Sequence, residues 1–285
     1  MSHDHRIGVI GAGVIGVGVA ENLAATGHTV VLVDVSAERL DAATDRLRDS
    51  LRTARLLGQH VSGEAPAAVL ARVEPTLSYE PLQETTFVIE NVVERWEVKE
   101  RVYERLDAVC PPACIFAANT SAIPIRRIAA ATRRADRVVG VHFMNPVPRK
   151  ATVEVIRGPE TTPDTLERTA QLLARMGKHG IVVQDRPGFI SNRILMLAIN
   201  EAILTVEEGV APAPDVDRLF RECFGHAMGP LETADLIGLD TILDTLHVLR
   251  ELTRDDKFLP SALLRQMVDA GLTGRKRGRG FYRYD

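Results

Sequence analysis

A glycine-rich turn between two apolar runs is the feature that most restricts how this chain can fold. The run Ile7–Ile10 predicts a buried strand and leads into Gly-Ala-Gly-Val-Ile-Gly at residues 11–16. An apolar helical pattern covers residues 14–25, and a second predicted strand, Val30–Val33, ends at Asp34. Strand, glycine turn, helix, strand and acid in this order are typical of a dinucleotide-binding βαβ unit.

The residues of the turn have separate physical roles. Gly11 permits the tight turn, Gly13 lets the backbone approach a pyrophosphate, and Gly16 lets the helix pack close to the strand. The N–H groups that start the helix, around Val14 and Ile15, offer hydrogen bonds and a positive dipole end to phosphates. We therefore predict a bound dinucleotide; the alternative is a glycine-rich turn with no ligand.

The acid after the second strand predicts which dinucleotide binds. Asp34 lies 23 positions after Gly11, where its carboxylate can accept hydrogen bonds from both ribose hydroxyls. A carboxylate at that position would repel a 2′-phosphate, so the sequence favours NAD over NADP.

The composition excludes several classes of protein. The chain of 285 residues has 45% hydrophobic and 26% charged residues, which is ordinary for a soluble globular protein of one or two domains. A net charge of −3 gives no case for a nucleic-acid or membrane partner, and no apolar run approaches the ~20 residues of a membrane span. The three cysteines match no zinc or redox spacing, so we expect no metal. Their sparse, odd count without an export signal favours a reducing cytoplasm.

The pattern of elements predicts two domains. Strands and helices alternate up to about residue 183, which predicts an N-terminal Rossmann-like, doubly wound and mainly parallel sheet. Further strands are predicted at residues 87–90, 115–118, 137–143, 152–156 and 181–183, and helices at 37–57, 65–72, 95–109 and 163–176. After residue 186 the patterns are helical, at 190–208, 216–224, 241–252 and 261–270. We therefore expect a cofactor domain at 1–186 and an all-α domain at 187–285.

The first helix of the second domain is apolar over most of its circumference. A domain of about 100 residues is also small for a fully independent core. Burial of this helix against a second subunit would account for both features and predicts a homodimer. Burial within the same chain is the alternative.

Eight stretches together resemble the L-3-hydroxyacyl-CoA dehydrogenase family, which includes 3-hydroxybutyryl-CoA dehydrogenases. In family order they are GAGVIGVG, VIENVVERWEVK, ANTSAIPI, VGVHFMNPV, VEVIRG, DRPGFISNRI, GPLETADLIGLDT and GRGFYRY. The resemblance implies the two-domain fold, an NAD cofactor, and dimers formed largely through the helical domain. It also implies an oxidoreductase of fatty acid metabolism that interconverts 3-hydroxyacyl and 3-oxoacyl thioesters.

The resemblance assigns four catalytic residues. Oxidation of a secondary alcohol needs a base for the hydroxyl proton, and His142 matches the family's base. Glu154 matches the acid that orients the imidazole, Ser121 the serine that binds the substrate oxygen, and Asn192 the asparagine that helps to polarise it. This match would place the active site between the two domains. Taken singly, the four could be a structural histidine, a surface salt bridge, a helix cap and a helix-start residue.

Further cofactor contacts follow from the same resemblance. Glu94 and Lys99 match two of them, Ser121 lies beside the nicotinamide, Asn145 positions the floor of the site, and Lys276 matches a lysine of the tail. Without the family, Glu94 and Lys99 would be an exposed helical salt bridge and Lys276 part of a solvated charge run.

The substrate handle departs from the family pattern. The family binds CoA with a serine and, seven residues later, a lysine. Ser50 aligns with the serine, but Leu57 occupies the lysine position, and Met144 departs from the commonest residue. Arg52 and Arg55 are close enough to take over the phosphate contact. The thioester could therefore be carried by CoA or by an acidic acyl carrier protein.

Two other functions remain as alternatives from the sequence. A free hydroxyacid dehydrogenase with a catalytic lysine would use Lys178, which precedes a predicted strand and lacks a supporting motif. A non-catalytic dinucleotide-binding protein is the other alternative, against which Ser121, His142, Glu154 and Asn192 count.

Overall fold

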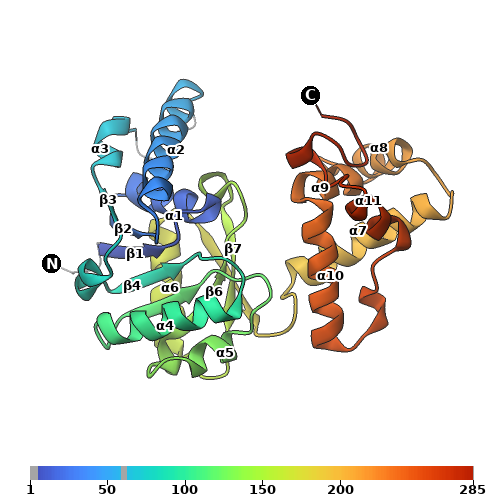
Figure 1. Cartoon of the computed structure of the whole chain (residues 1–285). Coiled ribbons are helices and arrows are strands. Elements are labelled where there is room, and N and C mark those ends of the chain that lie inside the picture. Colours follow the sequence, from blue (N-terminus) through green and yellow to red (C-terminus); the bar gives the residue numbers. More distant parts are fainter. Residues whose placement is uncertain (1–5, 59–62, 285) are drawn as a thin grey trace. The chain divides into compact units, whose positions relative to one another are not determined.

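A computed structural model describes residues 6–58 and 63–284 of the chain. The chain divides into two compact units, Met1–Arg186 and Pro187–Asp285 (Figure 1). Within the described ranges, no helix is both long enough and apolar enough to cross a membrane.

The first unit is built on one eight-stranded sheet. Its strands are β1 (Arg6–Ile10), β2 (Thr29–Val33), β3 (Val73–Thr76), β4 (Phe87–Glu90), β5 (Ile115–Ala118), β6 (Val138–His142), β7 (Thr152–Arg157) and β8 (His179–Gln184). They lie in the order β3-β2-β1-β4-β5-β6-β7-β8. Neighbouring strands are parallel except β6 and β7, which are antiparallel. The predicted fold, a mainly parallel doubly wound sheet followed by an all-α region, is confirmed.

Among the described residues of this unit, six α-helices accompany the sheet. They are α1 (Val14–Ala25), α2 (Ala37–Leu56), α3 (Pro66–Leu70), α4 (Trp96–Val109), α5 (Ile125–Ala130) and α6 (Pro163–Arg175), with the short 3-10 turns η1 (Glu80–Glu84), η2 (Ala135–Arg137) and η3 (Val147–Arg149). Local sequence explains where the longer ones begin. The Ser36 hydroxyl accepts the Arg39 N–H at the start of α2, and the Thr162 hydroxyl accepts the Thr165 N–H at the start of α6.

Strand β3 is absent from the sequence-based prediction. It contains Pro75, which lowers strand propensity and cannot donate a ladder hydrogen bond. The sheet tolerates this proline because β3 is its edge strand, paired only with β2 in the described sheet. Position at the edge is a tertiary property, so the local pattern could not reveal it.

The sheet brings the carboxyl ends of its parallel strands to one edge. The order β3-β2-β1-β4-β5-β6 changes direction between β1 and β4, the point where doubly wound sheets bind ligands. Gly11, Asp34, Asn91 and Asn119 follow β1, β2, β4 and β5 at this edge, and His142 ends β6. Because β7 runs antiparallel to β6, its early residue Glu154 lies directly opposite His142.

The second unit is helical. Its elements are α7 (Ser191–Glu207), α8 (Ala213–Phe224), α9 (Pro230–Ile237), α10 (Leu239–Thr253) and α11 (Ala262–Asp269), with the 3-10 turns η4 (Asp256–Phe258) and η5 (Arg275–Arg277). Helix α9 is missing from the prediction because it is short and begins directly after Gly229. Residues of all five α-helices form one apolar core, which includes Ile199, Leu231 and Leu246.

Two buried aspartates connect the end of the chain to this helical unit. Asp217 accepts the N–H groups of Leu231 and Glu232 and the hydroxyl of Tyr282, at 2.7–2.8 Å. Asp235 accepts the N–H groups of Phe281 and Tyr282 at 3.0 and 2.9 Å. The motif GPLETADLIGLDT and the tail GRGFYRY are therefore partly explained by folding. The first motif supplies Asp235 on α9, and the second supplies the backbone N–H groups that Asp235 binds.

Candidate functional site

The glycine turn has the geometry that a pyrophosphate requires. Gly11 has φ +95°, and a Cβ on it would lie 2.8 Å from the Asn91 carbonyl oxygen. A Cβ on Gly16 would lie 1.8 Å from the Gly11 oxygen, so helix and strand approach too closely for any side chain. A Cβ on Gly13 would meet nothing within 4 Å. Packing therefore requires glycine at positions 11 and 16. Gly13 instead leaves open space that fits a phosphate next to the start of α1.

Asp34 is nearly buried at the end of β2. Its Oδ2 accepts the Ala12 N–H at 2.8 Å and its Oδ1 accepts the Val35 N–H at 2.7 Å. The carboxylate therefore also holds the glycine turn in place. Each oxygen keeps a further lone pair that a ribose hydroxyl could use. The turn and Asp34 together suit a dinucleotide.

His142 joins an acid and a hydroxyl in one line of hydrogen bonds. Its Nδ1 lies 2.8 Å from Glu154 Oε2, and its Nε2 lies 3.0 Å from Ser121 Oγ. An ionised carboxylate only accepts, so Nδ1 carries the proton and Nε2 accepts from the serine hydroxyl. His142 and Glu154 are both nearly buried, with exposed fractions of 6% and 7%. The imidazole thus lies between the Ser121 hydroxyl and the Glu154 carboxylate.

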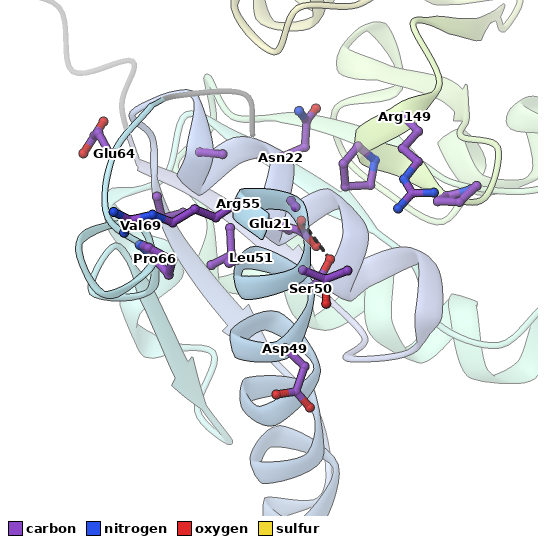
Figure 2. Close-up of a pocket in the computed structure, with 15 residues that line it drawn as sticks. Glu21, Asn22, Asp49, Ser50, Leu51, Arg55, Glu64, Pro66, Val69 and Arg149 are labelled. Carbon is purple, nitrogen blue, oxygen red and sulfur yellow. Dashed lines mark hydrogen bonds between the residues drawn. The ribbon is translucent and has the colours of Figure 1, made fainter. Parts of the chain in front are cut away.

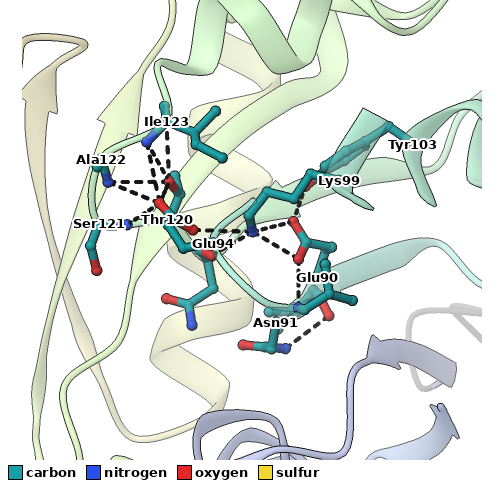
Figure 3. Close-up of polar contacts among 12 residues, drawn as sticks. Glu90, Asn91, Glu94, Lys99, Tyr103, Thr120, Ser121, Ala122 and Ile123 are labelled. Carbon is teal, nitrogen blue, oxygen red and sulfur yellow. Dashed lines mark hydrogen bonds and ion pairs between the residues drawn. The ribbon is translucent and has the colours of Figure 1, made fainter. Parts of the chain in front are cut away.

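The loop that carries Ser121 is held by Glu94. One oxygen of Glu94 accepts the backbone N–H groups of Ser121, Ala122 and Ile123 at 3.0, 3.0 and 3.2 Å, and also the Thr120 hydroxyl (Figure 3). Burial raises the pKa of Glu94, but the Lys99 charge and these hydrogen bonds outweigh it and lower the pKa. The carboxylate therefore stays ionised at neutral pH.

Lys99 lies beneath this loop and has no exposed surface. Its ammonium is 2.8 Å from each oxygen of Glu90, 3.1 Å from the Asn119 carbonyl oxygen and 3.5 Å from Glu94. Glu90 is equally buried. The alternative of an exposed helical salt bridge is therefore wrong. The expected contact of Lys99 with the cofactor stays a prediction.

A pocket of about 370 Å³ lies among α1, α2, α3 and the turn η3 (Figure 2). Ser50 and Arg55 line it from α2, and Arg149 from η3. The Ser50 hydroxyl donates to Glu21 at 3.0 Å. Burial raises the pKa of Glu21 against this hydrogen bond and the charge of Arg149. The pocket thus combines a buried acid with two arginines.

Arg52 is not one of the residues that line this pocket. It lines a second pocket, of about 820 Å³, together with Arg48 and Arg55. Leu57, where the family has a lysine, is 58% exposed just after the helix. Arg55 borders both pockets.

The remaining predicted residues lie elsewhere. Asn145 is exposed after β6 and joined to Pro146 by a cis peptide bond. Asn192 belongs to the first turn of α7, and Lys276 belongs to η5, where its ammonium lies 2.5 Å from Asp240. The last two belong to the helical unit, and their contact with substrate or cofactor stays a prediction.

Lys178 does not have the environment of a catalytic lysine. It is 3% exposed, and its ammonium donates to the backbone oxygens of Val147 and Lys150 at 2.6 and 2.8 Å. Burial lowers its pKa. These two hydrogen bonds connect Lys178 to both ends of the turn η3. Within the described ranges, no group of three metal-binding side chains comes together.

Sequence reasoning missed two acids. Glu90 ends an apolar strand. This position predicts only that the residue lies at the edge of the sheet where ligands bind. Glu21 lies within the apolar helix α1, where a carboxylate among Val, Ala and Leu is an anomaly that could have been noticed. Both are buried and both contact residues of the proposed site.

Fold and site define a class: a Rossmann-type oxidoreductase with a histidine–carboxylate pair at the ligand edge of the sheet. The NAD-binding domain of 3-hydroxyacyl-CoA dehydrogenase matches residues 6–186, and the C-terminal domain of the same enzyme matches residues 188–284. The chain belongs to the 3-hydroxyacyl-CoA dehydrogenase family. It is an NAD-binding enzyme that acts on 3-hydroxyacyl-CoA substrates.

Individual relatives match over nearly the whole chain. The 3-hydroxybutyryl-CoA dehydrogenase of Bradyrhizobium diazoefficiens is 45% identical over 280 residues, 98% of this chain and 95% of the relative. A probable 3-hydroxybutyryl-CoA dehydrogenase of Bacillus subtilis is 42% identical, over 98% of this chain and 97% of the relative. The solved structure of the (S)-3-hydroxybutyryl-CoA dehydrogenase of Ralstonia eutropha has a TM-score of 0.94 at 39% identity and covers 99% of both chains.

Proposed function

We propose that the enzyme interconverts 3-hydroxybutyryl-CoA and acetoacetyl-CoA, with His142 as general acid and base. The observation that carries the proposal is the line of hydrogen bonds Ser121–His142–Glu154 at the ligand edge of the sheet. The names of the relatives support a short acyl chain.

In the oxidation, the hydroxyl of the substrate must lose its proton as its carbon loses hydride. His142 Nε2 is the acceptor for that proton, because Nδ1 already carries one. The buried carboxylate of Glu154 stabilises the imidazolium that forms. NAD, when bound, accepts the hydride, and in the reverse direction NADH supplies it.

Ser121 has two roles in this scheme. Without substrate, its hydroxyl donates to His142 Nε2. With substrate, the same hydroxyl can turn and donate to the reacting oxygen, which leaves Nε2 available for the proton. Asn192 is proposed to polarise the same oxygen from the helical unit.

Residues of the glycine turn are proposed to hold the cofactor. Gly11, Gly13, Val14, Ile15 and Gly16 bind the pyrophosphate, and Asp34 binds the ribose of the adenosine half. Glu94, Asn145 and Lys276 are proposed as further contacts.

The substrate handle is proposed to bind along α2. Ser50 and Arg55 line one pocket, and Arg52 and Arg55 the other. Arginines suit the phosphates of CoA because the guanidinium binds phosphate oxygens in pairs. The free-hydroxyacid alternative has no support, since Lys178 is bonded to backbone carbonyls.

The enzyme is proposed to work as a homodimer in the cytoplasm. Ile194, on the first helix of the helical unit, is 63% exposed, and Leu195 is 37% exposed. An apolar face of this kind suits a second copy of the unit. The cytoplasm is proposed from the sparse, odd cysteine count of the sequence.

One experiment tests the substrate. NADH oxidation is measured with acetoacetyl-CoA, with the same acyl group on pantetheine, and with the same group on an acyl carrier protein. We expect the highest kcat/KM with acetoacetyl-CoA. Higher kcat/KM with the carrier-bound form would show that the arginines of α2 serve a protein partner, and turnover only of free oxoacids would contradict the proposal.

A further inference from the structure

We propose that the buried Lys99–Glu90 ion pair is a positioning element for Ser121, acting through Glu94, and is not a cofactor contact. The inference rests on the proposed role of Ser121 in the reaction. It assigns a function to the buried pair of Lys99 and Glu90 and to the partly exposed carboxylate of Glu94 that contacts Lys99.

The ion pair is complete without a ligand. The ammonium of Lys99 has three N–H groups, and both oxygens of Glu90 and the Asn119 carbonyl oxygen lie within 3.1 Å of it. Glu90 also accepts the hydroxyl of Tyr103 at 3.0 Å and the N–H of Val92 at 2.6 Å. Both charged side chains are fully buried. Lys99 therefore has neither exposed surface nor a spare donor for a cofactor.

The pair fixes the ends of two neighbouring strands. Glu90 is the last residue of β4, and Asn119 directly follows β5. Lys99 comes from helix α4 and bonds to both, so it joins the helix to the edge where ligands bind. Charge makes this link strong, because a buried ammonium cannot give up its carboxylate without a large desolvation cost.

The link continues from Lys99 to Ser121 through one carboxylate. Glu94 has one oxygen 3.5 Å from the ammonium of Lys99. Its other oxygen accepts three consecutive backbone N–H groups, the first of which belongs to Ser121 (Figure 3). The positive charge of Lys99 keeps this oxygen pair ionised and oriented. Ser121 Oγ then lies 3.0 Å from His142 Nε2.

The position of Ser121 should therefore depend on the buried pair. Without the Lys99 charge, only the hydrogen bonds of the Ser121 loop hold Glu94, and its 35% exposed side chain can turn toward solvent more easily. The three N–H groups would lose their common acceptor, and the serine would leave the line with His142. Displacement of a reacting group by about 1 Å can cost on the order of 100-fold in rate.

Two variants test the link. In the first, Glu90→Gln and Lys99→Met are combined, so that no buried charge is left unpaired. The second is Glu94→Gln, which changes a partly exposed residue and leaves the buried pair intact. Glu97→Gln is the matched control, because Glu97 is an exposed glutamate in the first turn of the same helix. Each is measured for kcat, KM and the Kd of NADH, also in a Ser121→Ala background, with thermal unfolding as a check of the fold.

We expect kcat to fall about 10- to 100-fold in both test variants, and the Kd of NADH to stay within about twofold of wild type in the variant that lacks the Glu90–Lys99 charges. In the Ser121→Ala background the same changes should have little further effect, because the serine is no longer there to be positioned. Glu97→Gln should match wild type. If the charge-removed pair fails to fold, the kcat of Glu94→Gln, measured with Ser121 present and in the Ser121→Ala background, decides the question.

Three results would overturn the proposal in different ways. A tenfold or larger rise in the Kd of NADH with unchanged kcat in the Glu90→Gln, Lys99→Met variant would make Lys99 a cofactor contact. Losses that multiply fully with Ser121→Ala would show that the pair acts independently of the serine. Near-normal kcat in Ser121→Ala alone would refute the proposed catalytic role of Ser121, and the positioning proposal with it.

Discussion

His142 and Glu154 face each other across the antiparallel strands β6 and β7, with 2.8 Å between Nδ1 and Oε2. Side chains of directly opposed residues lie on the same face of a sheet. The pair is therefore held by strand register, and neither side chain depends on a flexible loop for its position. Both are buried, which strengthens their interaction.

We expect His142→Ala to lower kcat by about 10²- to 10⁴-fold, the usual contribution of a general base. Glu154→Gln should also lower kcat strongly, because the amide removes the charge and can favour the wrong tautomer. Steady-state NADH oxidation measures both, and NADH affinity should change little. The double variant should be little worse than His142→Ala. Near-normal kcat for folded His142→Ala would place the base elsewhere.

We expect NADH to exceed NADPH in kcat/KM by at least about tenfold. The carboxylate of Asp34 would repel a 2′-phosphate, and close like charges cost several kcal/mol. Steady-state kinetics with both cofactors and a fixed concentration of acetoacetyl-CoA measure the ratio. Equal efficiency with NADPH would contradict the assignment of Asp34.

Replacing both Arg52 and Arg55 with Ala should raise KM about tenfold or more for acetoacetyl-CoA and little for the pantetheine thioester. The reason is that only the former carries the phosphates that arginines bind. Arg46→Ala, on the same helix but outside both pockets, is the matched control. Equal increases in KM for both thioesters would show that Arg52 and Arg55 face solvent and do not bind the CoA phosphates.

The protein should have the mass of a dimer at micromolar concentration in light scattering. Ile194→Glu should shift it toward monomer, because a charge within an apolar interface loses its hydration. Glu201→Gln, an exposed position on the same helix, serves as the control. A monomer mass for the wild-type chain would refute the homodimer.

Asp107 should make stability dependent on acid pH. Burial raises its pKa, but hydrogen bonds from Arg133 and Arg134 outweigh burial and lower it. Its folded-state pKa thus lies below the unfolded value of about 4, so its contribution is full above pH 4 and is lost as pH falls through the folded-state pKa. Asp107→Asn should cost about 3 kcal/mol at pH 7 and less near pH 3 in urea unfolding. The exposed Asp45→Asn should cost under about 1 kcal/mol.

The sequence by itself determined the cofactor half of the site. Gly11, Gly13, Gly16 and Asp34 lie within one βαβ unit, where local periodicity and short-range spacing are enough to predict both structure and ligand. The ends of the strands before Ser121 and His142 could also be predicted, because buried parallel strands are continuous apolar runs. The pairing of His142 with Glu154 came from resemblance to a family and not from the residues themselves.

Only the tertiary structure decided which charged groups meet. Read from the sequence alone, Lys99 and Glu94 would be a surface salt bridge, yet Lys99 is buried against Glu90 from another element. Tertiary structure also decided that Glu154 lies opposite His142 and that the proline-containing strand β3 forms the edge of the sheet. Local pattern reports which face of an element is buried, whereas the identity of a partner depends on strand order and register. Those are set by contacts between residues distant in the chain.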